Sequence, residues 1–256
     1  SVDYFSNKID GKYNVATALR QPGSSIKPIN YAVAIETGKI TAASVADDDP
    51  TCFTQTNQAA YCPTNYGGAY HGIQSIRNSL ANSLNIPAVK VLKVNGLETF
   101  VASASAMGLT TLKNASDYGL SLTLGGGEVT MSDMTVAYGT LANMGVRQDL
   151  NPILKIVDKD GKTLEEYKYE AGKRVMSRET CFIIQQILSD DGARSMVFGS
   201  GSMLKIKNHP EVAVKTGTTN DMRDNWTMGY TQDYVVATWV GNNDNSKMGG
   251  LVSGTT

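Results

Sequence analysis

Residues 20–28 read RQPGSSIKP, and the fold is best interpreted outward from this stretch. The pair Pro22-Gly23 predicts a turn, behind which apolar residues recur near helical spacing as far as about Thr37. Pro28 lies in the first turn of that helix, where a proline removes only an N–H that has no intrahelical partner. We therefore predict a turn that leads directly into a helix over residues 25–37.

Ser24 and Lys27 stand three residues apart at this helix start, so their side chains share one face with Cβ atoms roughly 5–6 Å apart. A serine hydroxyl becomes a nucleophile when a base takes its proton, and lysine can be that base if burial or nearby positive charge lowers its pKa. The alternative is a helix-capping serine followed by a solvated lysine. The pattern alone is weak, because about 1.25 matches are expected by chance, and Ser202 with Lys205 forms a second one that we interpret as a coincidence.

A second motif, Ser83-Leu84-Asn85, lies in NSLANSLNIPAVK at a predicted helix end, where Pro87 is expected to break the helix. A serine exposed there can relay a proton. An asparagine amide is both donor and acceptor, so it can hold a peptide carbonyl and a lysine ammonium together. The alternative is an ordinary helix C-terminal cap.

A third motif, Lys215-Thr216-Gly217-Thr218, closes the predicted strand EVAVKTGT. The threonine hydroxyls and the bare backbone at Gly217 suit an extended ligand, and Lys215 can attract a carboxylate. Only about 0.15 matches are expected by chance, which makes this motif the most informative of the three. The alternative is an exposed strand with a solvated lysine.

The remaining pattern predicts an α/β chain of the α+β type. Helical periodicity recurs over 73–93, 96–107, 130–144 and 177–190, behind a polar loop over about 44–70. A hairpin is predicted from 152–158 and 163–169 around Asp160-Gly161, and three strands over 211–217, 225–232 and 234–241. Because these three strands follow one another closely, we expect them to form an antiparallel sheet packed with helices.

Composition excludes several classes of protein. The 256 residues are 41% hydrophobic and 18% charged, which is typical of a folded chain, and the net charge of −1 gives no basic field for nucleic acid. No apolar run has the length of a bilayer span. The chain begins without Met or a signal peptide, so we interpret it as a domain excised from a longer protein.

The cysteines and histidines do not predict a metal site or a cofactor. Three cysteines without a CxxC pair and two distant histidines, His71 and His209, lack the spacing of a zinc site, and the histidines are predicted to be polar loop residues. Cys52 and Cys62 flank a loop and fit either a disulfide in an extracytoplasmic protein or two reduced thiols. Cys181 lies in an apolar stretch and is predicted to be in the core.

Taken in order, S-x-x-K, S-x-N and K-T-G are the signature of the penicillin-recognising serine enzymes. With NYGGAYHG, DDGARSMVFG, AVKTGTTNDMRDNW and WVGNND, the chain resembles the transpeptidase domain of a class A (bifunctional) penicillin-binding protein over nearly its whole length. This resemblance implies a penicillin-binding transpeptidase or serine β-lactamase-like fold with an added all-helical subdomain, spanning residues 1–256. We expect the family's glycosyltransferase domain, its membrane anchor, the strand before SVDYF and the helix after SGTT to lie outside this chain.

The resemblance also implies roles for the residues of the three motifs. Ser24 would attack the penultimate D-alanine of a peptidoglycan stem peptide, and an amine of a neighbouring stem would then take the acyl group. The other catalytic residues would be Lys27 as base, Ser83 as proton relay, Asn85 as holder of the substrate amide, and Lys215. Lys215, Thr216 and Thr218 would bind the terminal carboxylate, and Gly217 would let the substrate approach the strand closely. Backbone N–H groups of Ser24 and Thr218 would form the oxyanion hole, and Asp224 and Asn225 would buttress the sheet edge. β-Lactams would inhibit this D,D-transpeptidase, which would act outside the cytoplasm and bind no nucleic acid.

Two rival functions share these motifs. A class A β-lactamase hydrolyses its acyl-enzyme with a glutamate in an E-x-x-L-N loop, where this chain has R-x-x-L-N with Arg147, Leu150 and Asn151. Arginine cannot act as a base at neutral pH, and Asp149 is the nearest carboxylate. A penicillin-sensing receptor domain would have nearly the same sequence but would stop after one equivalent of acylation.

Overall fold

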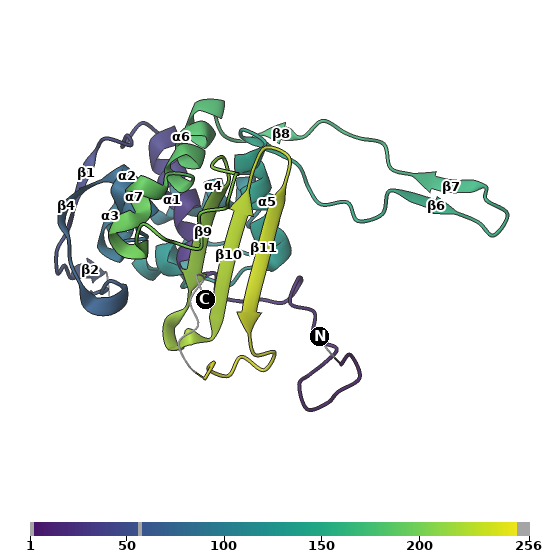
Figure 1. The fold of residues 1–256 in the computed structure, drawn as a ribbon, viewed down its shortest axis with the longest axis horizontal. Coiled ribbons are helices and arrows are strands. Elements are labelled where there is room, and N and C mark those ends of the chain that lie inside the picture. The colour runs from purple at the N-terminus through teal and green to yellow at the C-terminus, as the bar shows by residue number, and fades with distance from the viewer. Residues whose placement is uncertain (1–2, 56–57, 250–256) are drawn as a thin grey trace.

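A three-stranded antiparallel sheet forms the centre of the fold in the computed structural model, which describes residues 3–55 and 58–249 (Figure 1). The strands β9 (Ala213–Thr218), β10 (Asp224–Tyr230) and β11 (Val235–Gly241) lie in the order β11-β10-β9. Trp226 in β10 lies opposite Gly217 on one side and Trp239 on the other. The predicted strands and their antiparallel pairing are confirmed.

Helices cover one face of this sheet and surround a buried central helix. α5 (Met131–Ala142) and α6 (Arg178–Leu188) pack on the strands, and α1 (Lys27–Glu36) lies behind them against α3 (Asn85–Asn95), α4 (Leu97–Met107) and α6. Residues 27–34 of α1 are all buried, including the polar Lys27 and Asn30. The main core has members such as Ile29, Val33, Tyr138, Ile184, Trp226 and Met228, and a smaller cluster contains Phe53, Ile86 and Val89.

The segment 73–93 is not one helix, as the sequence predicts, but a strand and two helices. β4 (Gly72–Ser75) leads into α2 (Ile76–Ala81), and α3 begins at Asn85. The break over 82–84 precedes Pro87, so the prediction that Pro87 causes it is wrong. Pro87 lies in the first turn of α3, where its missing N–H costs no intrahelical bond.

Further short elements escaped the sequence patterns. The turn before α1 is the 3-10 segment η1 (Gly23–Ile26), and others are η3 (Ala115–Asp117) and η4 (Leu120–Leu124). α7 (Asp191–Phe198) was not predicted, because its sequence is short and polar. Its N-terminus is capped by Asp190, whose carboxylate accepts a 2.9 Å hydrogen bond from the Ala193 backbone N.

The predicted polar loop over about 44–70 also contains strands. β1 (Val45–Asp48) pairs with β4, β2 (Phe53–Gln55) pairs with β3 (Gln58–Tyr61), and η2 (Tyr66–Gly68) follows. Cys52 and Cys62 are joined by a disulfide, which settles the two readings left open by the sequence, and Cys181 is buried as predicted. These strands have polar side chains on both faces, so their sequences lack the alternation of apolar and polar residues from which a strand is predicted.

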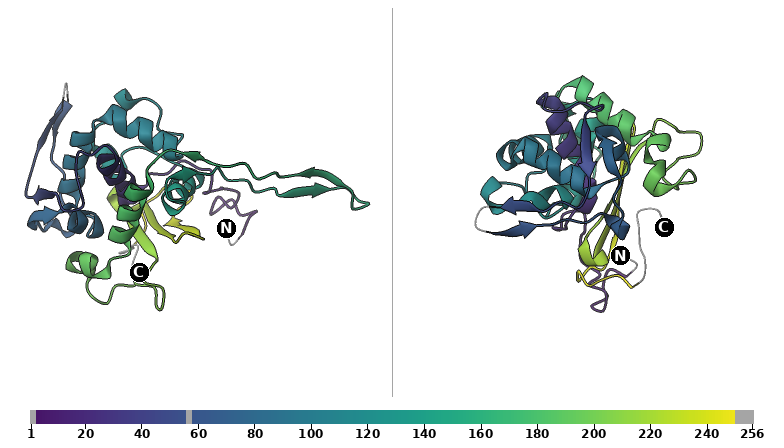
Figure 2. Two further views of the ribbon diagram at one scale, coloured as in Figure 1. Left: turned by 90° about the horizontal axis from the view of Figure 1, so that it is seen from above. Right: turned by 90° about the vertical axis from the view of Figure 1, so that its left-hand side faces the viewer.

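The predicted hairpin projects far from the body of the molecule as an arm (Figures 1 and 2). β6 (Lys155–Val157) and β7 (Thr163–Glu166) form its outer part, while β5 (Val146–Arg147) and β8 (Lys173–Arg174) pair at its base. Within residues 3–55 and 58–249, no helix is long and apolar enough to cross a bilayer. In the same part of the chain, no cluster of three His, Cys, Asp or Glu side chains could hold a metal ion.

Candidate active site

Ser24 lies on the η1 turn, which the sheet and α5 hold from behind. Trp226 Nε1 donates a 2.9 Å hydrogen bond to the Gln21 carbonyl, and Tyr138 OH donates one of 2.7 Å to the Ser25 carbonyl. The Ser25 hydroxyl donates a 2.6 Å bond back to the Pro22 carbonyl. Neither η1 nor α1 has a side-chain cap, so the alternative of a helix-capping serine at position 24 is wrong. The Ser24 side chain instead lines a cleft.

Glycines bring the η1 turn into backbone contact with β9. A Cβ atom built on Gly217 would lie 2.8 Å from the Ser25 backbone N, and one on Gly23 would lie 2.6 Å from the Thr218 carbonyl oxygen. Gly23 also has a φ of 55°, which a residue with a side chain rarely adopts. Gly217 does not line the cleft, so its expected role in ligand approach is corrected: its missing side chain lets β9 lie against the turn that carries Ser24.

Lys27 is fully buried, and its amino group is held by the S-x-N segment. Nζ donates 2.6 Å hydrogen bonds to the Ser83 carbonyl and to Asn85 Oδ1, and a 3.2 Å bond to the Leu84 carbonyl. It also lies 3.4 Å from Ser83 Oγ. Burial, and then the charge of Lys215, hold the pKa of Lys27 well below its usual range, although Asp48 opposes this. A lysine that acts as a base requires a pKa lowered in this direction.

Ser83 occupies the break between α2 and α3, where its backbone has a φ of 59°. A serine in this left-handed region is strained, and such strain is concentrated at functional sites. Lys215 Nζ donates a 2.8 Å hydrogen bond to Ser83 Oγ and one of the same length to the Thr216 carbonyl. Burial, followed by the charge of Arg194, lowers the pKa of Lys215 to about 7. The two motif lysines therefore converge on one hydroxyl.

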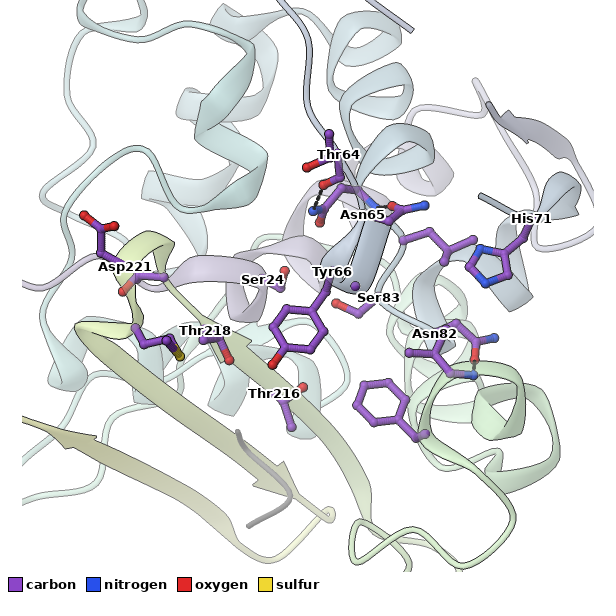
Figure 3. A pocket seen from close by; sticks show the side chains of 17 residues that line it. Ser24, Thr64, Asn65, Tyr66, His71, Asn82, Ser83, Thr216, Thr218 and Asp221 are labelled. Atoms are coloured by element: carbon purple, nitrogen blue, oxygen red, sulfur yellow. Dashed lines mark hydrogen bonds between the residues drawn. The ribbon is translucent and has the colours of Figure 1, made fainter. Parts of the chain in front are cut away.

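The three motifs meet at an open cleft of about 530 Å³ (Figure 3). Ser24, Ser83, Asn85, Thr216 and Thr218 line it, whereas Lys27 and Lys215 lie buried beneath it. The sequence predicted this set, and the fold brings it together from η1, the α2–α3 break and β9. Sequence reasoning missed the other lining residues: Thr64, Asn65, Tyr66, Gly67, His71, Asn82, Leu84, Val197, Phe198, Thr219, Asp221 and Met222.

Some of the missed residues had a signal in the sequence. Thr64 and the following stretch NYGGAYHG, residues 65–72, contain the paired glycines Gly67 and Gly68, which predict a turn. They do not indicate which part of the molecule that turn contacts. His71 lies in a loop, as predicted, but it also lies 2.8 Å from Asp48 through Nδ1 and lines the cleft, which the sequence did not indicate. His209 is an exposed loop residue beside Glu211, as predicted.

The competing candidates lie away from the cleft. Ser202 is in a loop, and Lys205 is largely exposed at 4.0 Å from Asp191, so this second S-x-x-K match builds no site. Arg147 pairs with Asp149 at 2.8 Å and donates to carbonyls at the end of α4. Both line a separate cavity at the base of the hairpin. The expectation that Arg147 occupies the place of a deacylating glutamate is therefore wrong.

Asp224 and Asn225 are buried at the start of β10, where Asn225 lies opposite Thr218. Trp239 Nε1 donates a 3.0 Å hydrogen bond to Asp224, and Arg20 lies 3.6 Å from the same oxygen. Burial raises the pKa of Asp224, against the opposing effects of Trp239 and Arg20. The contacts of Asp224 join β10 to β11 and to Arg20 beside the third motif, in line with a buttressing role for this residue.

Known proteins resemble this chain along almost its whole length. The family described as penicillin binding protein transpeptidase domain matches residues 5–256. Penicillin-binding protein 1A of Clostridium botulinum is 34% identical over 253 residues, which are 95% of this chain and 30% of that protein. Penicillin-binding protein 1C of Escherichia coli is 31% identical over 251 residues, or 98% of this chain and 30% of that protein. The chain thus spans about 30% of the length of these relatives.

Solved structures share the fold. Penicillin-binding protein 1A from Haemophilus influenzae has a TM-score of 0.82 at 28% identity, covering 96% of this chain and 42% of that one. A Mycobacterium tuberculosis penicillin-binding protein solved in complex with penicillin V has a TM-score of 0.81 at 22% identity, covering 95% and 67%, and shows the likeness of fold alone. The match over residues 5–256, together with the three motifs around one cleft, establishes that this chain belongs to the penicillin-binding protein transpeptidase domain family.

Proposed function

We propose that this domain is a serine D,D-transpeptidase that cross-links peptidoglycan stem peptides and is inhibited by β-lactams. The observation that carries the proposal is the convergence of two buried lysines on Ser83 Oγ, at 2.8 Å from Lys215 Nζ and 3.4 Å from Lys27 Nζ, beside the cleft that Ser24 lines. A lysine with a lowered pKa can take the proton of a serine hydroxyl at neutral pH.

In the acylation step, Ser24 Oγ attacks the carbonyl of the penultimate D-alanine while its proton passes to neutral Lys27. Backbone N–H groups of Ser24 and Thr218 would hold the oxyanion, which is supported by the contact between the η1 turn and Thr218. The C–N bond then breaks, and the proton moves from Lys27 through Ser83 to the departing amine. Terminal D-alanine leaves, and the remaining peptide stays bound as an ester of Ser24.

In the second step, an amine of a neighbouring stem attacks the ester carbonyl. Its proton passes back through the same groups to Ser24 Oγ, so the serine is regenerated and a new amide bond is formed. Asn85 would hold the donor amide, while Lys215, Thr216 and Thr218 would bind the donor carboxylate. The positive charge of Lys215 and the threonine hydroxyls on the cleft wall suit that anion.

We infer that the whole protein acts outside the cytoplasm, where its peptidoglycan substrate lies, and that it carries a membrane anchor and a glycosyltransferase domain. The Cys52–Cys62 disulfide supports an oxidising compartment. The likeness to penicillin-binding proteins 1A and 1C supports the additional domain, because this chain spans only about 30% of their length.

A donor peptide ending in D-Ala-D-Ala, incubated with an amino acceptor, tests the proposed function. We expect mass spectrometry to detect released D-alanine and a donor–acceptor product that accumulates beyond one equivalent. A Ser24→Ala variant should form neither. Acylation that stops at one equivalent, with the acceptor present, would favour the sensor function over the transpeptidase, and product formation by the Ser24→Ala variant would reject the proposed mechanism.

A further inference from the structure

A fully buried carboxylate, Asp48 at the end of β1, lies behind the cleft wall. Its oxygens accept hydrogen bonds of 2.8 and 2.7 Å from Asn65 Nδ2, and one of 3.0 Å from the His71 backbone N. His71 Nδ1 lies 2.8 Å from the same carboxylate. A buried charge is stable only when it is hydrogen-bonded, and here its donors belong to two residues that line the cleft.

The carboxylate fixes which way the Asn65 amide points. A carboxylate only accepts hydrogen bonds, so the NH₂ group of Asn65 must face Asp48, and it also donates a 2.9 Å bond to the Ala69 carbonyl. Oδ1 of Asn65 must then face away from Asp48. There it accepts a 2.7 Å hydrogen bond from the Asn85 backbone N.

Asn85 links the Asn65 amide to the buried Lys27. Its side-chain NH₂ donates a 2.7 Å hydrogen bond to the Thr64 carbonyl, so its Oδ1 is turned toward Lys27 Nζ at 2.6 Å. The backbone N and the side-chain NH₂ of Asn85 thus both donate hydrogen bonds to one loop, at its neighbouring residues Asn65 and Thr64. An unbroken chain of hydrogen bonds therefore runs from Asp48 through Asn65 and Asn85 to Lys27.

We propose that Asp48 is a positioning residue for acyl transfer, which acts through Asn65 to hold Asn85 and the Lys27 amine in place. This inference rests on the proposed function. The residues proposed to bind the ligand carboxylate lie on β9 and are not part of the chain that starts at Asp48. Loss of the Asp48 carboxylate should therefore slow acylation more than it weakens the noncovalent binding of the ligand, to which Asn85 contributes only through the ligand amide.

The test uses stopped-flow acylation by a fluorescent penicillin over a range of concentrations. For Asp48→Asn and for Asn65→Asp, we expect the limiting acylation rate to fall about 10-fold to 100-fold, as small displacements of reacting groups do, and the half-saturating concentration to rise by a smaller factor. The double variant Asp48→Asn with Asn65→Asp reverses the direction of the hydrogen bond and should recover most of the lost rate. Asp47→Asn, which removes an exposed carboxylate next to Asp48, is the matched control and should acylate like the wild type.

The outcomes separate this inference from the proposed function. Wild-type acylation at Ser24 together with an unchanged rate in the folded Asp48→Asn variant would overturn the positioning role alone. A rise in the half-saturating concentration that exceeds the fall in rate, without rescue in the double variant, would also overturn it, because Asp48 would then only shape the cleft. If Asp48→Asn does not fold, Asn65→Asp gives the same test, and failure of both to fold would assign Asp48 a structural role instead. A wild-type chain that is not acylated at all would reject the proposed function and this inference with it.

Discussion

Lys215 Nζ donates a 2.8 Å hydrogen bond to Ser83 Oγ, so the third motif contacts the second directly. Lys27 Nζ approaches the same hydroxyl to 3.4 Å, and both lysines are buried. Burial first, and then the positive charge of Lys215 close by, lower the pKa of Lys27. This shift favours the neutral form that a base requires, while Lys215 supplies a charge that can attract an anionic ligand.

The nucleophile is the first residue to test. Replacing Ser24 by alanine should abolish covalent labelling by a fluorescent penicillin, because the Ser24 side chain lines the cleft and precedes by three residues the buried Lys27, whose pKa is lowered. Ser202→Ala, which removes the serine of the second S-x-x-K match, is the control and should label fully. Gel fluorescence and mass spectrometry of the labelled peptide give the readout, and labelling that survives Ser24→Ala would reject the assignment.

Lys27→Met should lower the acylation rate by about 10²-fold to 10⁴-fold, the usual contribution of a general base. The same change leaves the Ser83 and Leu84 carbonyls and Asn85 Oδ1 without their donor, so the free energy of unfolding should fall by about 1–3 kcal/mol. Stopped-flow labelling and urea denaturation measure the two effects.

Lys39→Met is a matched control for that variant, because the Lys39 ammonium also donates to two backbone carbonyls, those of Val94 and Asn95, but is exposed and distant from the cleft. It should acylate like the wild type. A normal acylation rate in the Lys27→Met variant would mean that a different group takes the Ser24 proton, and Lys215 is the nearest alternative.

Binding of an anionic ligand should weaken as the pH rises through about 7, where Lys215 loses its charge. In a Ser24→Ala background, penicillin affinity measured by calorimetry should fall between pH 6 and pH 8, as judged from the pKa of about 7, and binding near pH 7 should take up protons. Lys215→Gln should bind weakly with no such slope. An affinity that is constant over this range would exclude Lys215 as the titrating cation.

Folding stability should depend on pH in the opposite sense. The Lys215 pKa is lowered in the folded state from 10.5 to about 7, so between these values the unfolded chain binds more protons than the folded one. The Lys215 contribution to the free energy of unfolding therefore rises with pH over this window and is least favourable below it. Subtracting the pH profile of the Lys215→Gln variant from that of the wild type isolates this contribution.

Gly217→Ala should damage the site although Gly217 does not line the cleft. Its new methyl group would meet Ser25 backbone and side-chain atoms at 2.8 and 2.9 Å, forcing β9 away from the η1 turn. We expect a loss of about 1–3 kcal/mol in stability and slower acylation. Gly139→Ala in α5 is the control, because nothing lies within 4 Å of its added carbon, and alanine favours a helix by about 0.5–1 kcal/mol. Equal effects of the two substitutions would contradict the contact.

The penicilloyl-enzyme should persist for many minutes at neutral pH. Among the described residues that line the cleft, Asp221 alone has a carboxylate, and it accepts a 2.8 Å hydrogen bond from Lys247. This bond and the charge of Lys247 lower the pKa of Asp221, which makes it a weak base for activating water. Intact-mass measurements after removal of excess penicillin give the lifetime. Regeneration within seconds would favour a β-lactamase, and Asp221, in place of the distant Asp149, would then be the first residue to replace.

The amino-acid sequence alone predicts the three motifs, the helix behind Ser24, the antiparallel pairing of β9, β10 and β11, and the hairpin around Asp160-Gly161. These features depend on local spacing, on turn residues such as Pro22-Gly23 and Asp160-Gly161, and on the short connections between consecutive strands. Such features can be predicted from a single sequence because the residues that form each of them are close together in the chain.

The surroundings of those motifs could not be predicted from the sequence, because they depend on how distant segments pack. The tertiary structure showed that Gly217 serves the contact between β9 and η1, that Arg147 faces another cavity, and that Asp48 is linked to Lys27 through Asn65 and Asn85. Asp48 lies at the end of β1, which pairs with β4, whereas Lys27 begins α1. No spacing of residues along the chain indicates that the two side chains are linked. Burial, which lowers the pKa of both motif lysines, is likewise a property of the packed molecule, because the chain around a lysine does not reveal which distant segments will exclude water from it.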